Sequence, residues 1–97
     1  MDKIREIFAD KSIVCGGRIT VYYQNRAIEV IEKCKELSIR FWGLNAFVIC
    51  GKGIQPFMEF SPDYSNIPNE EACDKGIEFI KIHQDKALLY EVVYEGY

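Results

Sequence analysis

The fold follows mainly from residues 39–50, which read IRFWGLNAFVIC. Apolar side chains fill both alternating sets of positions in this stretch, with one set at Ile39, Phe41, Phe47 and Ile49 and the other at Trp42, Leu44, Ala46 and Val48. A strand that is apolar on both faces is typical of the middle of a sheet that is covered at least in part on both sides. We therefore predict a central strand here, with Trp42 in the core.

A second strand is predicted after a short turn. Gly51-Lys52-Gly53 is a turn sequence, so residues 54–60 are expected to return antiparallel to the central strand. Pro56 lies inside this second strand and has no N–H group to donate to a neighbour, which places the strand at an edge of the sheet. Residues 61–69, SPDYSNIPN, are then the loop that leaves this edge.

Two helices are predicted from apolar residues at helical spacing. The first is expected over 25–37, capped by Asn25 and paired on its outer side by Glu29 and Lys33. Its expected apolar stripe is Ala27, Ile28, Ile31, Cys34 and Leu37. The second is expected over 69–84, capped by Asn69. Its expected buried face is Ala72, Cys73, Gly76, Ile77 and Ile80.

The last strand is predicted over 87–95, where ALLYEVVYE alternates apolar and mixed positions. The chain, 1–97, is then a single α/β domain of the α+β type with a small, mainly antiparallel, three-stranded sheet in the order 2-1-3. The second helix crosses from strand 2 to strand 3, with the usual right-handed connection. Residues 9–23 fit either a tight hairpin at Gly16-Gly17 or a glycine loop, and both are kept.

The residue types argue against most enzyme classes. His83 is the only histidine, and its place near a helix end favours a packing role over a general base or a zinc ligand. Neither glycine cluster matches a nucleotide-binding motif. The four cysteines, Cys15, Cys34, Cys50 and Cys73, form no C-x-x-C pair, which favours reduced thiols in a cytoplasmic protein. The sequence thus predicts no catalytic residue, no cofactor and no metal site.

Charge is unevenly distributed along the chain. Residues 59–78 hold six Asp/Glu and one Lys, whereas residues 1–58 carry an excess of Lys/Arg. An acidic surface disfavours nucleic acid and favours a basic protein. The sequence also has no apolar run that is long enough to span a membrane and no secretory signal at its N-terminus, so no membrane partner is expected.

The residues also resemble a known class. A helix that ends in CKELS leads into IRFWGLNAFVIC and then IQPFMEFSPDYS, and the similar region covers roughly 24–66 and the capped helix after it. This pattern is similar to small bacterial immunity proteins encoded beside polymorphic or contact-dependent growth inhibition toxins. The resemblance implies a cytoplasmic protein that neutralises a toxin, such as a nuclease, by direct binding. It assigns no functional residue.

Our hypothesis for the binding site joins the acidic segment to an aromatic anchor. Carboxylates near the rim steer a basic partner, and an aromatic residue anchors it. The predicted partner-binding residues are Glu59, Asp63, Tyr64, Glu70, Glu71 and Asp74.

Two competing interpretations stay open. Glu59 and Asp63 can form a carboxylate pair in a small-molecule or catalytic site built from residues 55–65, which a deep pocket would support. The exposed strand edges at 54–60 or 88–95 can instead pair with a second copy in a homodimer or larger homo-oligomer.

Overall fold

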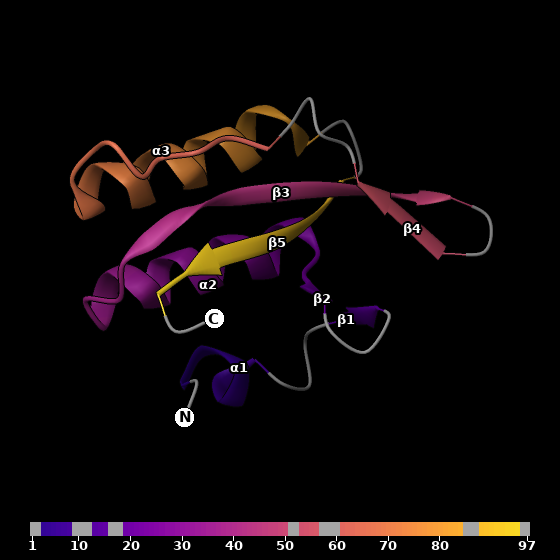
Figure 1. The fold of residues 1–97 in the computed structure, drawn as a ribbon, viewed down its shortest axis with the longest axis horizontal. Coiled ribbons are helices and arrows are strands. Elements are labelled where there is room, and N and C mark those ends of the chain that lie inside the picture. The colour runs from indigo at the N-terminus through magenta and orange to yellow at the C-terminus, as the bar shows by residue number, and fades with distance from the viewer. Residues whose placement is uncertain are drawn as a thin grey trace.

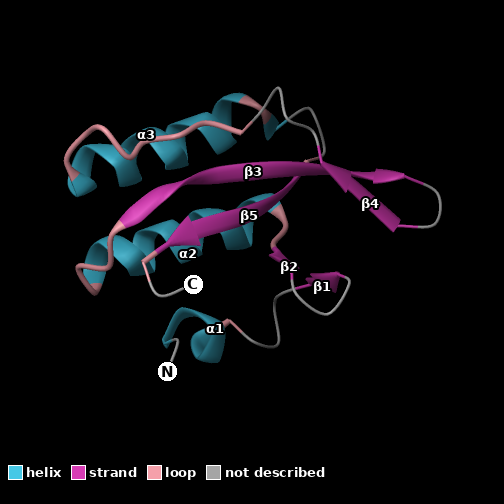
Figure 2. Cartoon of the chain, in the orientation of Figure 1, coloured by secondary structure: helices cyan, strands magenta, loops and turns pink. Residues whose placement is uncertain are grey.

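The computed structural model describes residues 3–8, 13–15, 19–50, 53–56, 61–84 and 88–95. Three helices and five strands are present in these ranges (Figures 1 and 2). In chain order they are α1 (Lys3–Ile7), β1 (Ile13–Cys15), β2 (Ile19–Val21), α2 (Gln24–Glu36), β3 (Phe41–Cys50), β4 (Gly53–Pro56), α3 (Asn69–Ile82) and β5 (Leu89–Tyr94). None of the described helices is long and apolar enough to cross a membrane.

The main sheet is antiparallel, and β3 lies between β4 and β5. Asn45 pairs with Glu91 across the β3–β5 ladder, and Phe47 pairs with Pro56 across the β3–β4 ladder. The predicted α+β class with an antiparallel sheet is confirmed. The second predicted strand is described only at its start, because 57–60 lie outside the described residues.

A β-bulge near the start of β3 changes which side chains face the helices. The register with β5 shifts between Phe41 and Gly43, so Phe41 shares the helix-facing side with Leu44 and Ala46. Trp42 is the extra residue and is 37% exposed. The prediction that Trp42 belongs to the core was therefore wrong, because a bulge reverses the alternation of faces on one side of it.

The two long helices cover one face of the sheet, with α3 along β3 and α2 along β5 (Figure 1). The main core lies between them and the sheet, and it includes Ile31, Cys34, Cys73, Ile80 and Tyr90. The other face is covered in part by a small cluster of Val21, Phe47 and Leu89. Burial on both faces of β3 explains why both alternating sets of its side chains are apolar.

The structure corrects several details of the first long helix. Tyr23, not Asn25, is the N-cap residue of α2, and no side chain bonds to the first turn. Val30 is fully buried, whereas Leu37 is exposed. Glu29 pairs with Arg26, so the predicted bond to Lys33 is replaced, and Lys33 pairs instead with Glu36.

Asn69 connects α3 to β3 and does not cap the helix. The N-cap residue is Pro68, and Asn69 is the first helical residue. Its Oδ1 accepts a hydrogen bond from the Phe41 N–H at 2.8 Å, and its Nδ2 donates to the Ile39 carbonyl at 3.1 Å. These bonds satisfy the N–H group of the first residue of β3 and a carbonyl group just before the strand.

Gly76 lets α3 approach the sheet closely. A Cβ atom at this position would lie 2.6 Å from a ring carbon of Phe41. The buried face of α3 is otherwise Ala72, Cys73 and Ile80, as predicted, whereas Ile77 is partly exposed. Small residues on this face therefore make room for the Phe41 ring.

Cys34 and Cys73 are buried, and neither forms a disulfide. Burial raises the pKa of the Cys73 thiol, which keeps it protonated and unreactive. The side chains of Cys15 and Cys50 lie outside the described part of the chain, so the prediction of reduced thiols there stays a prediction.

Replacing Tyr90 with phenylalanine is expected to raise the free energy of unfolding at pH 7 by about 1 kcal/mol, because a buried hydroxyl without a partner is costly. Tyr90 is fully buried, and its hydroxyl has no hydrogen-bond partner in the described structure. Urea unfolding measures the change. A loss of stability of more than about 1 kcal/mol would show that the hydroxyl is satisfied.

Tyr90→Phe is also expected to change how the free energy of unfolding depends on pH in the alkaline range. Burial raises the pKa of Tyr90 from 10.0 to about 12. The unfolded chain therefore loses this proton at lower pH than the folded chain. Ionisation of Tyr90 leaves the free energy of unfolding unchanged below pH 10 and lowers it as the pH rises towards 12. Tyr90→Phe should remove this part of the alkaline decline.

Candidate functional site

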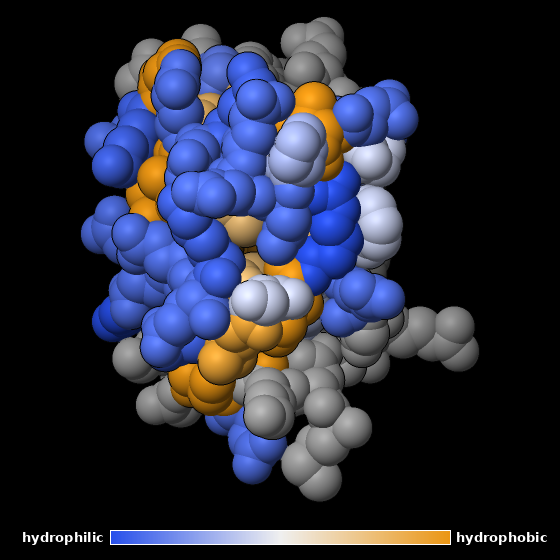
Figure 3. Space-filling model, turned by 90° about the vertical axis from the view of Figure 1, so that its left-hand side faces the viewer, coloured by the Kyte–Doolittle hydropathy of each residue, from blue (hydrophilic) through white to orange (hydrophobic). Residues whose placement is uncertain are grey.

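The outer side of α3 carries four exposed carboxylates. The buried residues of this helix face the sheet, so the remaining positions point away from it. The acidic face, as we name it, consists of Glu70, Glu71, Asp74 and Glu78, and all four are exposed. Three of them were predicted partner-binding residues, and Glu78 was not. Figure 3 looks onto the end of the molecule where α3 begins and α2 ends, and most of that face is hydrophilic.

Like charges repel one another along this helix. Glu70 and Asp74 are four residues apart, as are Asp74 and Glu78, and neighbours at this spacing destabilise a helix when their charges have the same sign. Lys35 of α2 offsets part of the repulsion, since its ammonium group bonds to Asp74 at 2.8 Å. This bond is the main cause that raises the pKa of Lys35. Among the described residues, no ion pair involves the other three carboxylates of the acidic face.

A shallow hollow adjoins the acidic face. It has a volume of about 220 Å³, and it is lined by Tyr64, Lys75, Glu78, Phe79 and Ile82. Ile82 is 63% exposed, which is unusual for a large apolar side chain on a helix. The hollow thus combines three apolar or aromatic side chains with one carboxylate, Glu78, and one ammonium group, Lys75.

Tyr64 is part of the fold as well as of the hollow. Its ring lies 5.9 Å from the Phe41 ring, and its hydroxyl donates to the Lys75 carbonyl at 3.4 Å. Burial, and then the charge of Glu78, raise the pKa of Tyr64. The predicted anchor is therefore half-buried and held against α3.

Residues 61–64 run beside β3 and were predicted to be only a loop. The Leu44 N–H donates to the Pro62 carbonyl at 3.1 Å, and the Tyr64 N–H donates to the Trp42 carbonyl at 2.8 Å. The segment approaches so closely that a Cβ atom on Gly43 would lie 2.5 Å from the Pro62 carbonyl oxygen. This contact fixes Asp63 at the edge of the sheet, opposite Gly43.

Asp63 is placed on this edge segment and not on α3. It accepts a hydrogen bond from the Ser65 N–H at 2.9 Å. The bonds from Ser65 lower the pKa of Asp63 and keep it ionised. Glu59 lies outside the described residues, so its predicted pairing with Asp63 stays a prediction.

Arg40 holds the loop after Asp63 in place. Its guanidinium donates to the carbonyls of Tyr64, Ser65 and Ile67 at 3.1, 3.2 and 2.7 Å. The same group lies 4.7 Å from the centre of the Trp42 ring, a cation–π contact. Nothing in the sequence pattern signals this role, because the three acceptors are backbone atoms.

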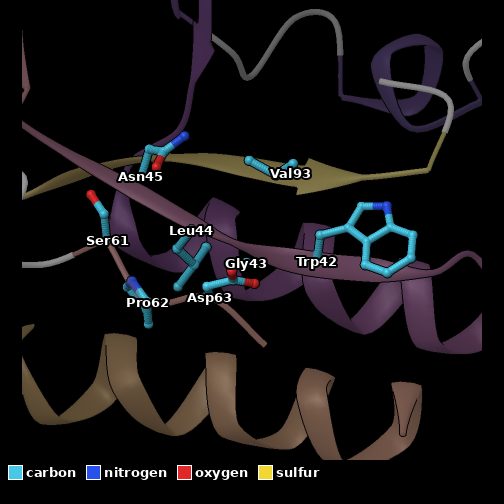
Figure 4. Close-up of a pocket in the computed structure, with 8 residues that line it drawn as sticks. All are labelled: Trp42, Gly43, Leu44, Asn45, Ser61, Pro62, Asp63 and Val93. Atoms are coloured by element: carbon cyan, nitrogen blue, oxygen red, sulfur yellow. The ribbon is translucent and has the colours of Figure 1, made fainter. Parts of the chain in front are cut away.

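A second pocket lies where residues 61–63 meet the sheet (Figure 4). Its volume is about 300 Å³, and it is open to solvent. The lining residues are Trp42, Gly43, Leu44, Asn45, Ser61, Pro62, Asp63 and Val93. They include a single carboxylate, Asp63.

His83 has a packing role in this structure. Its ring lies 4.3 Å from the Phe79 ring, and Nδ1 is 2.8 Å from the Phe79 carbonyl oxygen. Within the described ranges, no three His, Cys, Asp or Glu side chains gather as metal ligands.

Comparisons with family models, with curated proteins and with solved structures found no match.

Proposed function

We propose that this protein is a non-catalytic binding protein whose acidic face on α3 takes a basic protein partner. The partner class that the sequence resemblance implies is a bacterial toxin domain, and the protein then acts as its immunity protein. The observation that carries the proposal is the row of exposed carboxylates on α3 beside a hollow with an exposed apolar residue.

The charge arrangement supports a function in binding. A helix gains nothing from like charges at neighbouring positions, and Glu78 lies too far from the N-terminus to favour the helix dipole. A basic partner relieves this repulsion and is drawn in by long-range attraction. Glu70 and Glu71 lie in the first turn, where carboxylates also stabilise the helix, so Glu78 is the member of the acidic face that the helix dipole does not explain.

The hollow supplies the apolar part of such an interface. Protein interfaces combine a desolvated apolar centre with a charged rim. Ile82, Phe79 and Tyr64 form the apolar part here, and Glu78 joins it to the acidic face. A toxin that uses a basic cleft for its substrate, such as a nuclease, is blocked when an acidic surface covers that cleft.

Two variants with equal charge changes test the proposal. The acidic-face variant carries Glu70→Gln, Glu71→Gln and Glu78→Gln, which leaves the bond between Lys35 and Asp74 intact. The control variant carries Glu6→Gln, Glu32→Gln and Glu95→Gln, which are exposed carboxylates outside α3. Each protein is used as bait in cells of the source organism, and circular dichroism checks that each is folded.

We expect the wild type and the control variant to capture the same basic protein and the acidic-face variant to lose most of it. Expression of that protein alone should arrest growth, and co-expression with the wild type should restore it. Equal capture by all three baits would contradict the assignment of the acidic face. A captured protein that is harmless when expressed would contradict the immunity function but not the binding.

A further inference from the structure

We propose that the pocket beside Trp42 binds a protonated amine or guanidinium group. The pocket lies on the edge segment that holds Asp63, and the proposal does not depend on the acidic face of α3. Its polar side chains are the Asp63 carboxylate, the Ser61 hydroxyl, the Trp42 indole N–H and the Asn45 amide, whose nitrogen is bonded to Glu91. Only Asp63 carries a full charge. Such a set fits a cationic donor.

Asp63 supplies the charge. An ionised carboxylate offers about four acceptor positions. The N–H group of Ser65 occupies one of them. The remaining positions are available to a ligand, since Asp63 is exposed and lines the pocket.

Asn45 turns an acceptor towards the same space. Its Nδ2 donates to a carboxylate oxygen of Glu91 at 2.9 Å. An ionised carboxylate only accepts hydrogen bonds, so this contact fixes the orientation of the amide. Figure 4 shows the amide nitrogen of Asn45 turned away from Ser61, which leaves the amide oxygen on the side of the pocket.

Ser61 carries a hydroxyl that needs a partner. Its Oγ atom is buried, and it makes no hydrogen bond within the described structure. Buried polar atoms are nearly always satisfied, and a missing ligand is one reason for an exception. Ser61 lies beside Asn45, at the end of the pocket away from Trp42 (Figure 4).

Trp42 and Val93 form the apolar walls. They suit the alkyl part that carries an amine or guanidinium group. Arg40 lies against the Trp42 ring but is not a lining residue, and its guanidinium is bound by three carbonyls. An anion is disfavoured by the charge of Asp63, and a purely apolar ligand offers no donor to Asp63 or to the Asn45 amide oxygen.

Trp42 also makes the test direct, because it is the only tryptophan of the chain and it lines the pocket. Its fluorescence is followed while N-acetyl-arginine amide is added. N-acetyl-citrulline amide, which has the same shape without the charge, is the matched control ligand. Putrescine distinguishes a small free amine from the side chain of a protein.

We expect a saturable change with the arginine compound at roughly millimolar concentration. The citrulline compound should bind at least about tenfold more weakly. Asp63→Asn should weaken binding by a similar factor while keeping an oxygen for the bonds from Ser65. Ser61→Ala is a second variant, and it should weaken binding of the arginine compound by a smaller factor.

Saturable binding of the arginine compound without binding of putrescine would show that the pocket takes a side chain of a protein. Saturable binding of both would show that it also takes small free amines. The proposal is overturned if neither cation gives a saturable change. It is also overturned if citrulline matches arginine, or if Asp63→Asn and Ser61→Ala bind as tightly as the wild type.

Discussion

Replacing Phe41 with alanine is expected to lower the free energy of unfolding by about 3–5 kcal/mol, the cost of truncating a fully buried phenylalanine. The Phe41 ring is completely buried. It lies against Gly76 of α3 and within 5.9 Å of the Tyr64 ring. The cavity therefore opens where α3, β3 and the loop that carries Tyr64 meet, and little can collapse to fill it.

Trp42→Ala is the matched control for this prediction. Trp42 is larger than Phe41 and adjacent to it, but the bulge leaves it 37% exposed. We expect a loss of about 1 kcal/mol, from its contact with Arg40. Denaturant unfolding of both variants measures the difference. Equal losses, or a larger loss for Trp42→Ala, would mean that the alternation of β3 is unbroken and that the bulge is wrong.

Replacing Asn69 with alanine is expected to cost about 2–4 kcal/mol, because one backbone group at the first residue of β3 and one just before it lose their partner at once. The Phe41 N–H and the Ile39 carbonyl are both bonded to the Asn69 amide. Both bonds are partly buried, and they join the start of α3 to the start of β3. The start of β3 should then open more readily than the rest of the strand.

Amide hydrogen exchange locates this effect. The Phe41 amide should lose protection in Asn69→Ala, whereas amides near Phe47 change in proportion to global stability. Asn66→Ala, at an exposed position in the preceding loop, should change stability by less than about 0.5 kcal/mol. A cost for Asn69→Ala no larger than that of Asn66→Ala would show that the bonds to β3 contribute nothing.

Much of the fold was predictable because it depends on local periodicity. The apolar spacing of α2 and α3 identified both helices to within two residues at each end, and the two-faced pattern of 39–50 identified a strand of the main sheet. The bulge was not predictable, because Phe41 and Trp42 are equally apolar and only packing against Gly76 selects between them. Asn69 has the sequence signature of a helix cap, but its amide is used by β3.

The candidate site was also predictable from the sequence only in part. The charge count over residues 59–78 grouped Glu70, Glu71 and Asp74, and all three are exposed on α3, whereas their binding role stays a prediction. Asp63 is close to them in the sequence but belongs to the edge of the sheet, because residues 61–64 pair with β3. The pocket beside Trp42 was missed since its residues come from β3, β5 and the 61–63 segment and form no motif.

The most direct test of the central claim is the association rate constant of the captured partner with the wild type, the acidic-face variant and the control variant at low and high salt. We predict that the acidic-face variant associates about tenfold more slowly than the wild type at low salt, and that its rate depends less on salt. The control variant should keep most of the wild-type rate. An acidic-face variant with the rate and salt dependence of the wild type would contradict the account and remove α3 from the binding surface.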